Sequence, residues 1–160
     1  MIRKVCTYDA AEIAAIYNEY IERTTVTFET EPLTTEQMEH RIEKISRDFP
    51  YFVYTENGKI VGYAYAHKWR ERAAYSGTLE TTIYLDFNAR HKGIGRFLMQ
   101  NVINECKAQG FRVLIACITA ENHESVNFHK KLGFVQASLF HNVGQKFNRL
   151  LDVIDMELQL

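Results

Sequence analysis

Arg90-His91-Lys92-Gly93-Ile94-Gly95 precedes a stretch with the apolar spacing of an amphipathic helix, and this hexapeptide decides how the rest of the chain is interpreted. Three basic or potentially basic side chains and two glycines stand there, where that helix is expected to begin. Glycine inside a helix costs about 0.8–1 kcal/mol relative to alanine, so the pair indicates that a ligand approaches the backbone closely. Unpaired N–H groups at a helix N-terminus, helped by the helix dipole, bind phosphates. The hexapeptide therefore predicts a pyrophosphate-binding turn, and a surface bend is the alternative.

Two better-known glycine loops do not match this stretch. A Walker loop requires Gly-x-x-x-x-Gly-Lys-Ser/Thr, and the chain contains no such string. A Rossmann fingerprint requires a third glycine three residues after Gly95, but Leu98 stands there. The neighbours of the turn must therefore indicate what it binds.

Strand and helix patterns alternate on both sides of the turn. Strands are expected at residues 2–6, 51–55, 59–67, 79–85, 112–118, 134–141 and 151–158. Helices are expected from the N-cap Asp9 to Ile21, from Thr34 to about Arg47, from Gly93 to Gln109 and from Asn122 to Lys131. The threonine-rich stretch 22–33 reads as a loop or a short irregular helix. This order predicts an α/β fold with a mixed sheet and helices against it.

Finer patterns predict how single elements begin and which side chains they bury. Asp9 to Glu12 resembles a capping box with aspartate as the cap. Asn57-Gly58 predicts a tight turn between two strands. Strand 112–118 is almost unbroken in its apolar run, so we expect it to be covered on both faces. The helix after the turn is expected to bury Ile94, Phe97, Leu98, Val102 and Cys106.

The composition is that of one globular domain spanning residues 1–160. Hydrophobic residues make up 46% and charged residues 24% of the chain, whose length permits a well-buried core. The 19 basic and 20 acidic residues nearly cancel, which leaves no overall field to attract nucleic acid or an anionic membrane. No apolar run approaches the ~20 residues of a membrane span, and Met1 to Lys4 does not lead into a signal-peptide core. We expect a cytoplasmic protein that binds neither nucleic acid nor membrane.

The cysteines and histidines predict no metal site. Cys6, Cys106 and Cys117 match none of the paired spacings of zinc or redox motifs, so reduced thiols are expected. The histidines are scattered, and none has a cysteine or carboxylate partner at a metal-ligand spacing.

Segments that stand in a fixed order carry a family resemblance: strand 79–85, the turn 90–95, strand 112–118 and residues 122–134. Together they resemble the GCN5-related N-acetyltransferase (GNAT) family, whose signature Arg/Gln-x-x-Gly-x-Gly/Ala fits residues 90–95 in full. The resemblance extends over nearly the whole chain. It implies a central mixed sheet flanked by about four helices, and transfer of an acetyl group from acetyl-CoA to an amine.

A narrower resemblance rests on Thr27-Phe28-Glu29-Thr30-Glu31-Pro32, Arg72-Ala73-Ala74-Tyr75, Glu80 to Leu85, and Gly144 to Asp152. These segments look like the phosphinothricin and methionine sulfone/sulfoximine acetyltransferase branch. That branch implies a cytoplasmic homodimer that acetylates the α-amino group of small amino-acid analogues. Leu150 departs from the branch, whose members often carry tryptophan at that position.

The resemblance also implies where acetyl-CoA binds. Backbone groups of Ile83, Tyr84 and Leu85 pair with the pantetheine arm, and the N–H groups from His91 to Arg96 hold the pyrophosphate. Lys92 and Arg96 add charge, or are only solvated side chains. Asn122 is both a good N-cap and the family's coenzyme-contacting position. The complete set in and after the turn is Arg90, His91, Lys92, Gly93, Ile94, Gly95, Arg96 and Asn122.

Acetyl transfer requires a neutral amine, whereas a primary amine with a pKa of about 10.4 is protonated at pH 7. Glu80 matches the branch's catalytic glutamate and is the candidate general base, with a salt-bridged strand residue as the alternative. A backbone N–H near Tyr84 or Leu85 is expected to stabilise the oxyanion. His129 or Tyr84 is expected to protonate the departing CoA thiolate, although a packed helix histidine is the alternative for His129.

The same resemblance implies that Phe28, Arg72, Tyr75 and Lys146 bind the acceptor. Arginine can hold a carboxylate bidentately, and for Phe28 simple core packing is the alternative. Two other functions stay open on these residues. One is a protein or peptide N-terminal acetyltransferase on the same fold, and the other is a non-catalytic acyl-CoA-binding module.

Overall fold

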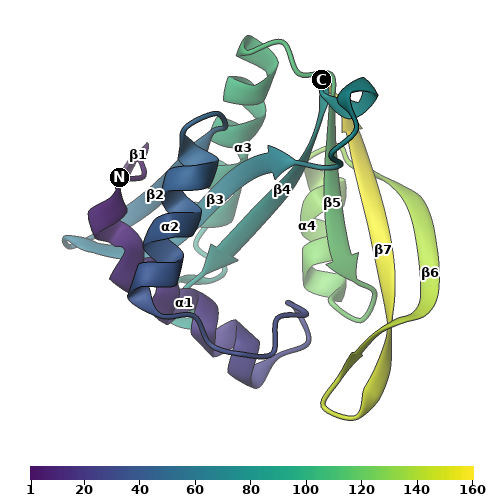
Figure 1. Cartoon of the computed structure of the whole chain (residues 1–160), viewed down its shortest axis with the longest axis horizontal. Coiled ribbons are helices and arrows are strands. Elements are labelled where there is room, and N and C mark those ends of the chain that lie inside the picture. Colours follow the sequence, from purple (N-terminus) through teal and green to yellow (C-terminus); the bar gives the residue numbers. More distant parts are fainter.

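A computed structural model describes residues 1–160, and all of its strands belong to one mixed sheet in the order β1-β2-β3-β4-β5-β7-β6 (Figure 1). The strands are β1 (Ile2–Lys4), β2 (Tyr51–Glu56), β3 (Lys59–Lys68), β4 (Thr78–Leu85), β5 (Val113–Thr119), β6 (Val135–Lys146) and β7 (Arg149–Gln159). The helices are α1 (Ala10–Arg23), α2 (Thr35–Ser46), α3 (Ile94–Ala108) and α4 (His123–Lys131). The predicted fold class and element order are confirmed.

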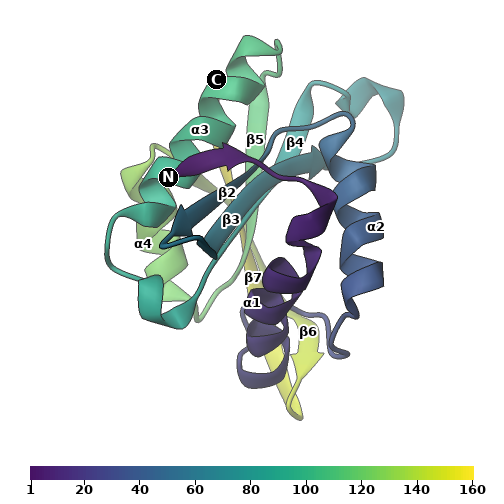
Figure 2. The same cartoon turned by 90° about the vertical axis from the view of Figure 1, so that its left-hand side faces the viewer.

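Helices cover both faces of the sheet, and each pair of helices encloses its own core (Figures 1 and 2). The apolar sides of α1 and α2 pack with tyrosines of β2 and β3 on one face, including the fully buried Tyr63. The apolar sides of α3 and α4 pack on the opposite face around Leu98, Val102 and Leu114. Side chains of successive strand residues point to opposite faces, so each central strand contributes to both cores.

The sheet is open in its middle, between β4 and β5. These parallel strands pair only from Thr78 to Glu80 and from Val113 to Ile115, and beyond that point they diverge (Figure 1). All other neighbouring strands are antiparallel. The backbone groups of the diverging edges therefore have no strand partner across the gap.

The start of α2 agrees with its sequence pattern, whereas the start of α1 does not. Thr34 and Gln37 form a capping box, with the Gln37 N–H donating to the Thr34 hydroxyl at 3.1 Å. The capping box predicted for Asp9 is wrong, because its carboxylate binds Arg3 at 2.7 Å and the Cys6 N–H at 2.9 Å. Glu12 instead accepts a hydrogen bond from the Ile60 N–H, which ties α1 to the sheet.

The C-terminal hairpin is longer than its sequence pattern indicates. β6 and β7 run on to a two-residue turn at Phe147 and Asn148, which have φ values of 51° and 57°. Such turns favour asparagine or glycine at both positions, so phenylalanine at the first position gives no turn signal. The predicted turn at Asn57-Gly58 has the same left-handed backbone and is confirmed.

Two predictions of burial are wrong, one for Phe97 and one for strand β5. Phe97 was expected in the core, but it lies on the outer side of α3 and is 60% exposed. Strand β5 is not covered on both faces, because Cys117 is exposed on the face opposite α3 and α4. No helix is long and apolar enough to span a membrane.

Candidate active site

The turn at residues 90–95 presents a row of unpaired amides. His91 and Gly93 have left-handed φ values of 63° and 80°, and α3 begins directly after Gly93. No backbone carbonyl accepts from the N–H groups of residues 91–95, whereas the Arg96 N–H donates to the Gly93 carbonyl at 3.1 Å. Adjacent free N–H groups at a helix N-terminus form an anion site. The geometry of the turn therefore fits a pyrophosphate, with the Arg96 amide outside the row.

Side chains of the turn hold it against neighbouring elements. The Arg90 guanidinium contacts the Glu124 carboxylate of α4 at 2.6 Å, and His91 lies 3.7 Å from the same carboxylate. Lys92 lies 3.8 Å from Glu56 at the end of β2. Arg90 thus positions the turn relative to α4.

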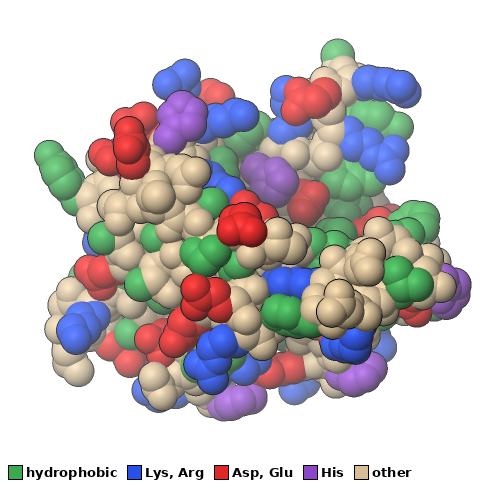
Figure 3. Space-filling model, turned by 60° about the horizontal axis from the view of Figure 1, so that its bottom comes forward, with side chains coloured by type: hydrophobic (Ala, Val, Ile, Leu, Met, Phe, Trp, Pro, Cys, Tyr) green, Lys and Arg blue, Asp and Glu red, His purple; other side chains and the backbone are tan.

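A cavity of about 950 Å³ passes through the gap between β4 and β5. Ile83, Tyr84, Asn122 and His129 line it together with residues of the α1 and α2 face. The molecule is hollowed on that face, and charged and histidine side chains surround the hollow (Figure 3). Gly95 is buried beside the gap, where an added Cβ would meet Ile83, Leu85 and Phe128 at 3.5 Å. A ligand held at the turn can therefore extend an arm between the two strands.

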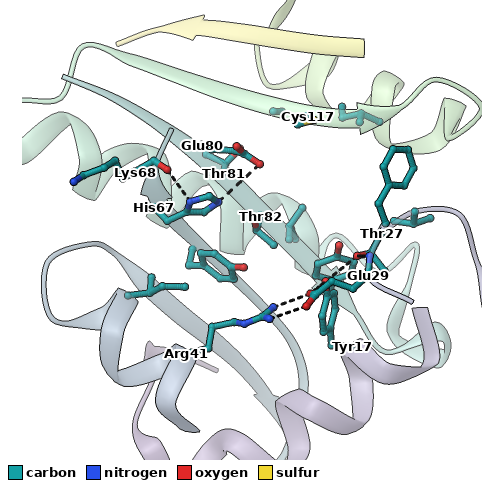
Figure 4. Close-up of a pocket in the computed structure, with 18 of the residues that line it drawn as sticks. Tyr17, Thr27, Glu29, Arg41, His67, Lys68, Glu80, Thr81, Thr82 and Cys117 are labelled. Carbon is teal, nitrogen blue, oxygen red and sulfur yellow. Dashed lines mark hydrogen bonds and ion pairs between the residues drawn. The ribbon is translucent and has the colours of Figure 1, made fainter. Parts of the chain in front are cut away.

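Glu80 lies where β4 and β5 separate, and its carboxyl group faces the cavity (Figure 4). Its side chain is only 29% exposed. Burial raises the pKa of Glu80 to about 7, and the negative charge of Asp155 on β7 adds to the increase. A carboxyl group with this pKa changes its protonation state near neutral pH, which suits a group that accepts and releases protons.

His67 is a neighbour of Glu80 that the sequence pattern did not identify. The residues are cross-strand partners on β3 and β4, with His67 Nε2 3.8 Å from Glu80 Oε1. Burial lowers the pKa of His67, and its Nδ1 hydrogen-bonds the Lys68 carbonyl at 2.9 Å. His67 is therefore neutral near pH 7, and the pair is not an ion pair there. Only the register of the hairpin brings the two residues together, and the irregular segment between β3 and β4 hides that register.

The two candidate proton donors approach the cavity from opposite faces of the sheet. His129 is 3% exposed on α4, and its Nδ1 lies 2.8 Å from the Ser125 carbonyl. A carbonyl can only accept, so Nδ1 carries the proton, and burial lowers the pKa of His129 so that the ring stays neutral. Tyr84 packs edge-on against Tyr17 and Tyr20, and burial raises its pKa well above the usual range. The Tyr84 hydroxyl therefore stays protonated, whereas the free ring nitrogen of neutral His129 can only accept.

The predicted acceptor-binding residues separate into two groups. Phe28 lines the cavity, and its ring lies on the backbone of Gly144, where no Cβ would fit. Lys146 does not line the cavity; it is 5% exposed, and its ammonium group donates to the Thr27 carbonyl at 2.9 Å. Arg72 and Tyr75 do not line the cavity; Tyr75 packs edge-on against Trp69, whose ring also contacts Arg70.

A polar cluster across the cavity from Glu80 was also missed from the sequence (Figure 4). Glu29 accepts from both terminal nitrogens of Arg41, at 2.9 and 2.8 Å, and from the Tyr17 hydroxyl. The Tyr17 hydroxyl also hydrogen-bonds the Thr27 hydroxyl at 2.7 Å. Arg41 gave no signal in the sequence because it lies on the mostly polar α2, where exposed arginines are common.

Comparison with known proteins adds three findings. The family model described as "Acetyltransferase (GNAT) domain" matches residues 2–155. Phosphinothricin N-acetyltransferase of Alcaligenes faecalis is 37% identical over 99% of this chain and 82% of its own. L-methionine sulfoximine/L-methionine sulfone acetyltransferase of Pseudomonas paraeruginosa is 34% identical over 99% of this chain and 94% of its own.

Among solved structures, a GNAT superfamily phosphinothricin acetyltransferase from Sinorhizobium meliloti in complex with AcCoA superimposes with a TM-score of 0.96. It shares 36% sequence identity and covers 100% of this chain and 88% of its own. The fold likeness therefore extends over the same length as the sequence likeness.

Proposed function

The chain belongs to the GNAT acetyltransferase family and is an acetyl-CoA-dependent N-acetyltransferase, and we propose that Glu80 is its general base and a small amino-acid analogue its acceptor. The observation that carries the proposal is the place of Glu80. Its carboxyl group lines the cavity at the point where β4 and β5 separate, and its pKa is about 7.

The donor half of the site is built from the turn and the gap. Acetyl-CoA supplies the activated acetyl group as a thioester. The unpaired N–H groups of residues 91–95 fit its pyrophosphate, and the diverging edges of β4 and β5 offer backbone groups to an extended arm. Asn122 caps α4 through the Ser125 N–H at 3.2 Å and lines the same cavity.

The acceptor amine must lose a proton before or during its attack on the thioester carbonyl. The Glu80 carboxylate takes that proton, the amine nitrogen forms the new bond to the acetyl carbon, and the carbon–sulfur bond breaks. A backbone N–H near Tyr84 or Leu85 stabilises the oxyanion that forms between these steps. Tyr84 gives a proton to the departing thiolate. His129 is not assigned this donation, because its ring is neutral, its Nδ1 proton is donated to the Ser125 carbonyl, and its other nitrogen can only accept.

The acceptor class rests on the named relatives and on the shape of the acceptor side. The relatives acetylate phosphinothricin and methionine sulfoximine or sulfone according to their names. In this chain, Phe28 and Glu29 of the segment after α1 line the same cavity as Glu80 and bound it on the acceptor side. This favours a small amino acid over an extended peptide.

The test is a coupled assay of CoA release with methionine sulfone, methionine sulfoximine and phosphinothricin, across pH 5.5–9. We expect kcat/KM to rise with pH and to level off above about 7, the pKa of Glu80, because only the carboxylate accepts a proton. The kcat/KM of Glu80→Gln should be about 10²–10⁴-fold lower than that of the wild type, and it should no longer rise with pH below about 7. Glu105→Gln on α3 is the matched control and should behave as wild type.

Outcomes of this assay separate the competing functions. Absence of CoA release with all three analogues contradicts the acceptor class. Turnover with peptides that have a free N-terminus, and not with the analogues, would favour the N-terminal acetyltransferase. Binding of acetyl-CoA without any turnover would favour the non-catalytic module.

We also propose that the chain acts as a cytoplasmic homodimer assembled through the β6–β7 hairpin. β6 is the outer strand of the sheet, so its far edge is unpaired. Large apolar side chains are exposed along the hairpin: Val135, Leu139, Phe140, Val143, Phe147 and Leu150. An apolar edge strand of this length favours association with a second surface.

A further inference from the structure

The segment after α1 is attached to the rest of the molecule at several points. We call residues 24–33 the acceptor loop. Near its start, the Thr119 hydroxyl donates to the Thr25 carbonyl at 2.6 Å, and the Thr25 hydroxyl donates to Glu121. Farther along, the Lys146 ammonium donates to the Thr27 carbonyl. These contacts fix the first part of the loop to the β5 and β6–β7 side of the cavity.

At its far end the loop is held by Asn18 of α1, which donates to the Leu33 carbonyl at 2.9 Å and accepts from the Leu33 N–H at 2.8 Å. Between these two attachments, one ion pair holds the loop at Glu29. Arg41 of α2 holds Glu29 bidentately at 2.8 and 2.9 Å, and the Arg41 guanidinium also lies 5.7 Å from the centre of the Tyr17 ring. Both groups are half-buried, with side-chain exposures of 32% and 37%. Glu29 joins this pair to Tyr17, and Tyr17 joins it to Thr27. The pair therefore closes a chain of hydrogen bonds from α2 to the loop residues that line the cavity.

Arg41 and Glu29 face the cavity from the side opposite Glu80 (Figure 4). Because Glu29 occupies both terminal nitrogens of Arg41, the guanidinium is not set up to hold an acceptor carboxylate bidentately. Without Arg41, Glu29 would be a half-buried carboxylate without a cation beside Tyr17, and the loop would move to return it to water.

We propose that Arg41 is a positioning residue for the acceptor: acting through Glu29, it holds the acceptor loop over the cavity so that Thr27 and Phe28 form the acceptor wall. The expected effect on the acceptor KM rests on the proposed function. The contacts between Arg41 and Glu29 do not depend on that function. Arg41 belongs to α2, which packs on the face of the sheet opposite α3 (Figure 2), so we expect its loss to leave the pyrophosphate site at the start of α3 unchanged.

The experiment compares Arg41→Met with Arg3→Met. Arg3 also forms a bidentate pair, with Asp9, at 2.7 Å for both contacts, and neither residue lines the cavity. Loss of a charge-assisted pair costs a similar stability in both variants. In Arg41→Met we expect the KM for the acceptor to rise about 10–100-fold with an unchanged KM for acetyl-CoA. In Arg3→Met both KM values should stay at the wild-type level.

A double-mutant cycle with Glu29→Gln separates positioning from direct binding. If Arg41 acts through Glu29, the double variant should lose no more than Arg41→Met alone. If Arg41 binds the acceptor carboxylate itself, Glu29→Gln should leave the acceptor KM unchanged or lower it. That second result would overturn the inference, as would equal effects of Arg41→Met on both KM values.

Hydrogen–deuterium exchange gives a readout that needs no acceptor. Amides 25–31 should exchange faster in Arg41→Met than in wild type, and at the wild-type rate in Arg3→Met. Equal exchange in the two variants would overturn the inference. If the wild-type protein acetylates none of the analogues, the acceptor proposal fails, while the exchange experiment still decides whether Arg41 holds the loop.

Discussion

At the level of one residue, the proposed role of Glu80 as general base conflicts with stability. The surroundings that raise its pKa from 4.5 to about 7 make its charged form unfavourable in the folded state. The same carboxyl group in the unfolded chain ionises freely near its ordinary pKa. Keeping a base with a pKa near neutrality in this cavity therefore destabilises the protein whenever the base is charged.

The pH dependence of this cost gives a prediction. Below about pH 4.5 Glu80 is protonated in both states, and its contribution to stability is fully present. As the pH rises from 4.5 through about 7, the unfolded state releases its proton first and stability is lost. Glu80→Gln carries no charge, so it should be more stable than wild type by about 1–3 kcal/mol at pH 8 and nearly equal at pH 4.5.

Thermal unfolding of the two proteins at both pH values measures this difference. For a chain of this size each kcal/mol shifts Tm by roughly 2–4 °C. Glu105→Gln, which removes a carboxylate outside the cavity, is the control. A lower Tm for Glu80→Gln at pH 8 would mean that a partner stabilises the Glu80 carboxylate.

The place of a site residue was predictable where a short motif carries it. Glu80 stands in a segment with a recognisable pattern, and the structure places it at the gap. His67, Arg41 and Glu29 depend on the register of a hairpin and on a loop that crosses to α2, which no local pattern encodes. Lys146, predicted to bind the acceptor, does not line the cavity, because its ammonium group has a buried carbonyl partner that its position in the sequence does not indicate.

At the level of elements, the glycines of the turn have different physical requirements. Gly93 has a φ of 80°, which disfavours any side chain, whereas Gly95 has helical geometry and room for a Cβ at ordinary contact distance. Gly93→Ala should therefore destabilise the protein by about 1 kcal/mol or more and weaken acetyl-CoA binding, because the amides 91–95 reorient. Gly95→Ala should keep its stability and its affinity for acetyl-CoA.

Calorimetric titration with acetyl-CoA and thermal unfolding of both variants check this contrast. Equal losses in the two variants would show that the left-handed backbone of the turn is not what limits binding. The contrast also accounts for the motif, which requires glycine at the first position and accepts alanine at the second.

The elements themselves were largely predictable, and the exceptions have physical causes. Helices α2 and α4 begin at the expected caps, because Thr34 and Asn122 use their side chains as their sequence positions indicate. The predicted β6–β7 hairpin is too short, since its left-handed turn contains Phe147 instead of glycine and so gives no turn signal. The capping box predicted at Asp9 is wrong because Arg3 binds the Asp9 carboxylate.

At the level of the whole molecule, the exposed hairpin predicts the assembly. Phe140 and Leu150 are 48% and 60% exposed on β6 and β7, and a homodimer through this surface would bury them. Phe140→Glu and Leu150→Glu should each shift the protein from dimer to monomer, because a charge buried without a partner is costly. Tyr8→Glu is the control, since Tyr8 is 96% exposed near the N-terminus.

Sedimentation velocity at micromolar concentration measures the oligomeric state of all four proteins. A wild-type monomer would contradict the assembly. A dimer that survives both substitutions would place the interface on another surface.

The gap between β4 and β5 also affects how cooperatively the chain unfolds. Only the short ladder from Thr78 to Glu80 joins the sheet formed by β1 to β4 with the sheet formed by β5 to β7. A ligand arm that hydrogen-bonds to both edges would replace the missing ladder and couple the two halves. Acetyl-CoA would then act as a structural component of the sheet, and in the ligand-free protein only the short ladder and the core under α3 and α4 would hold the two half-sheets together.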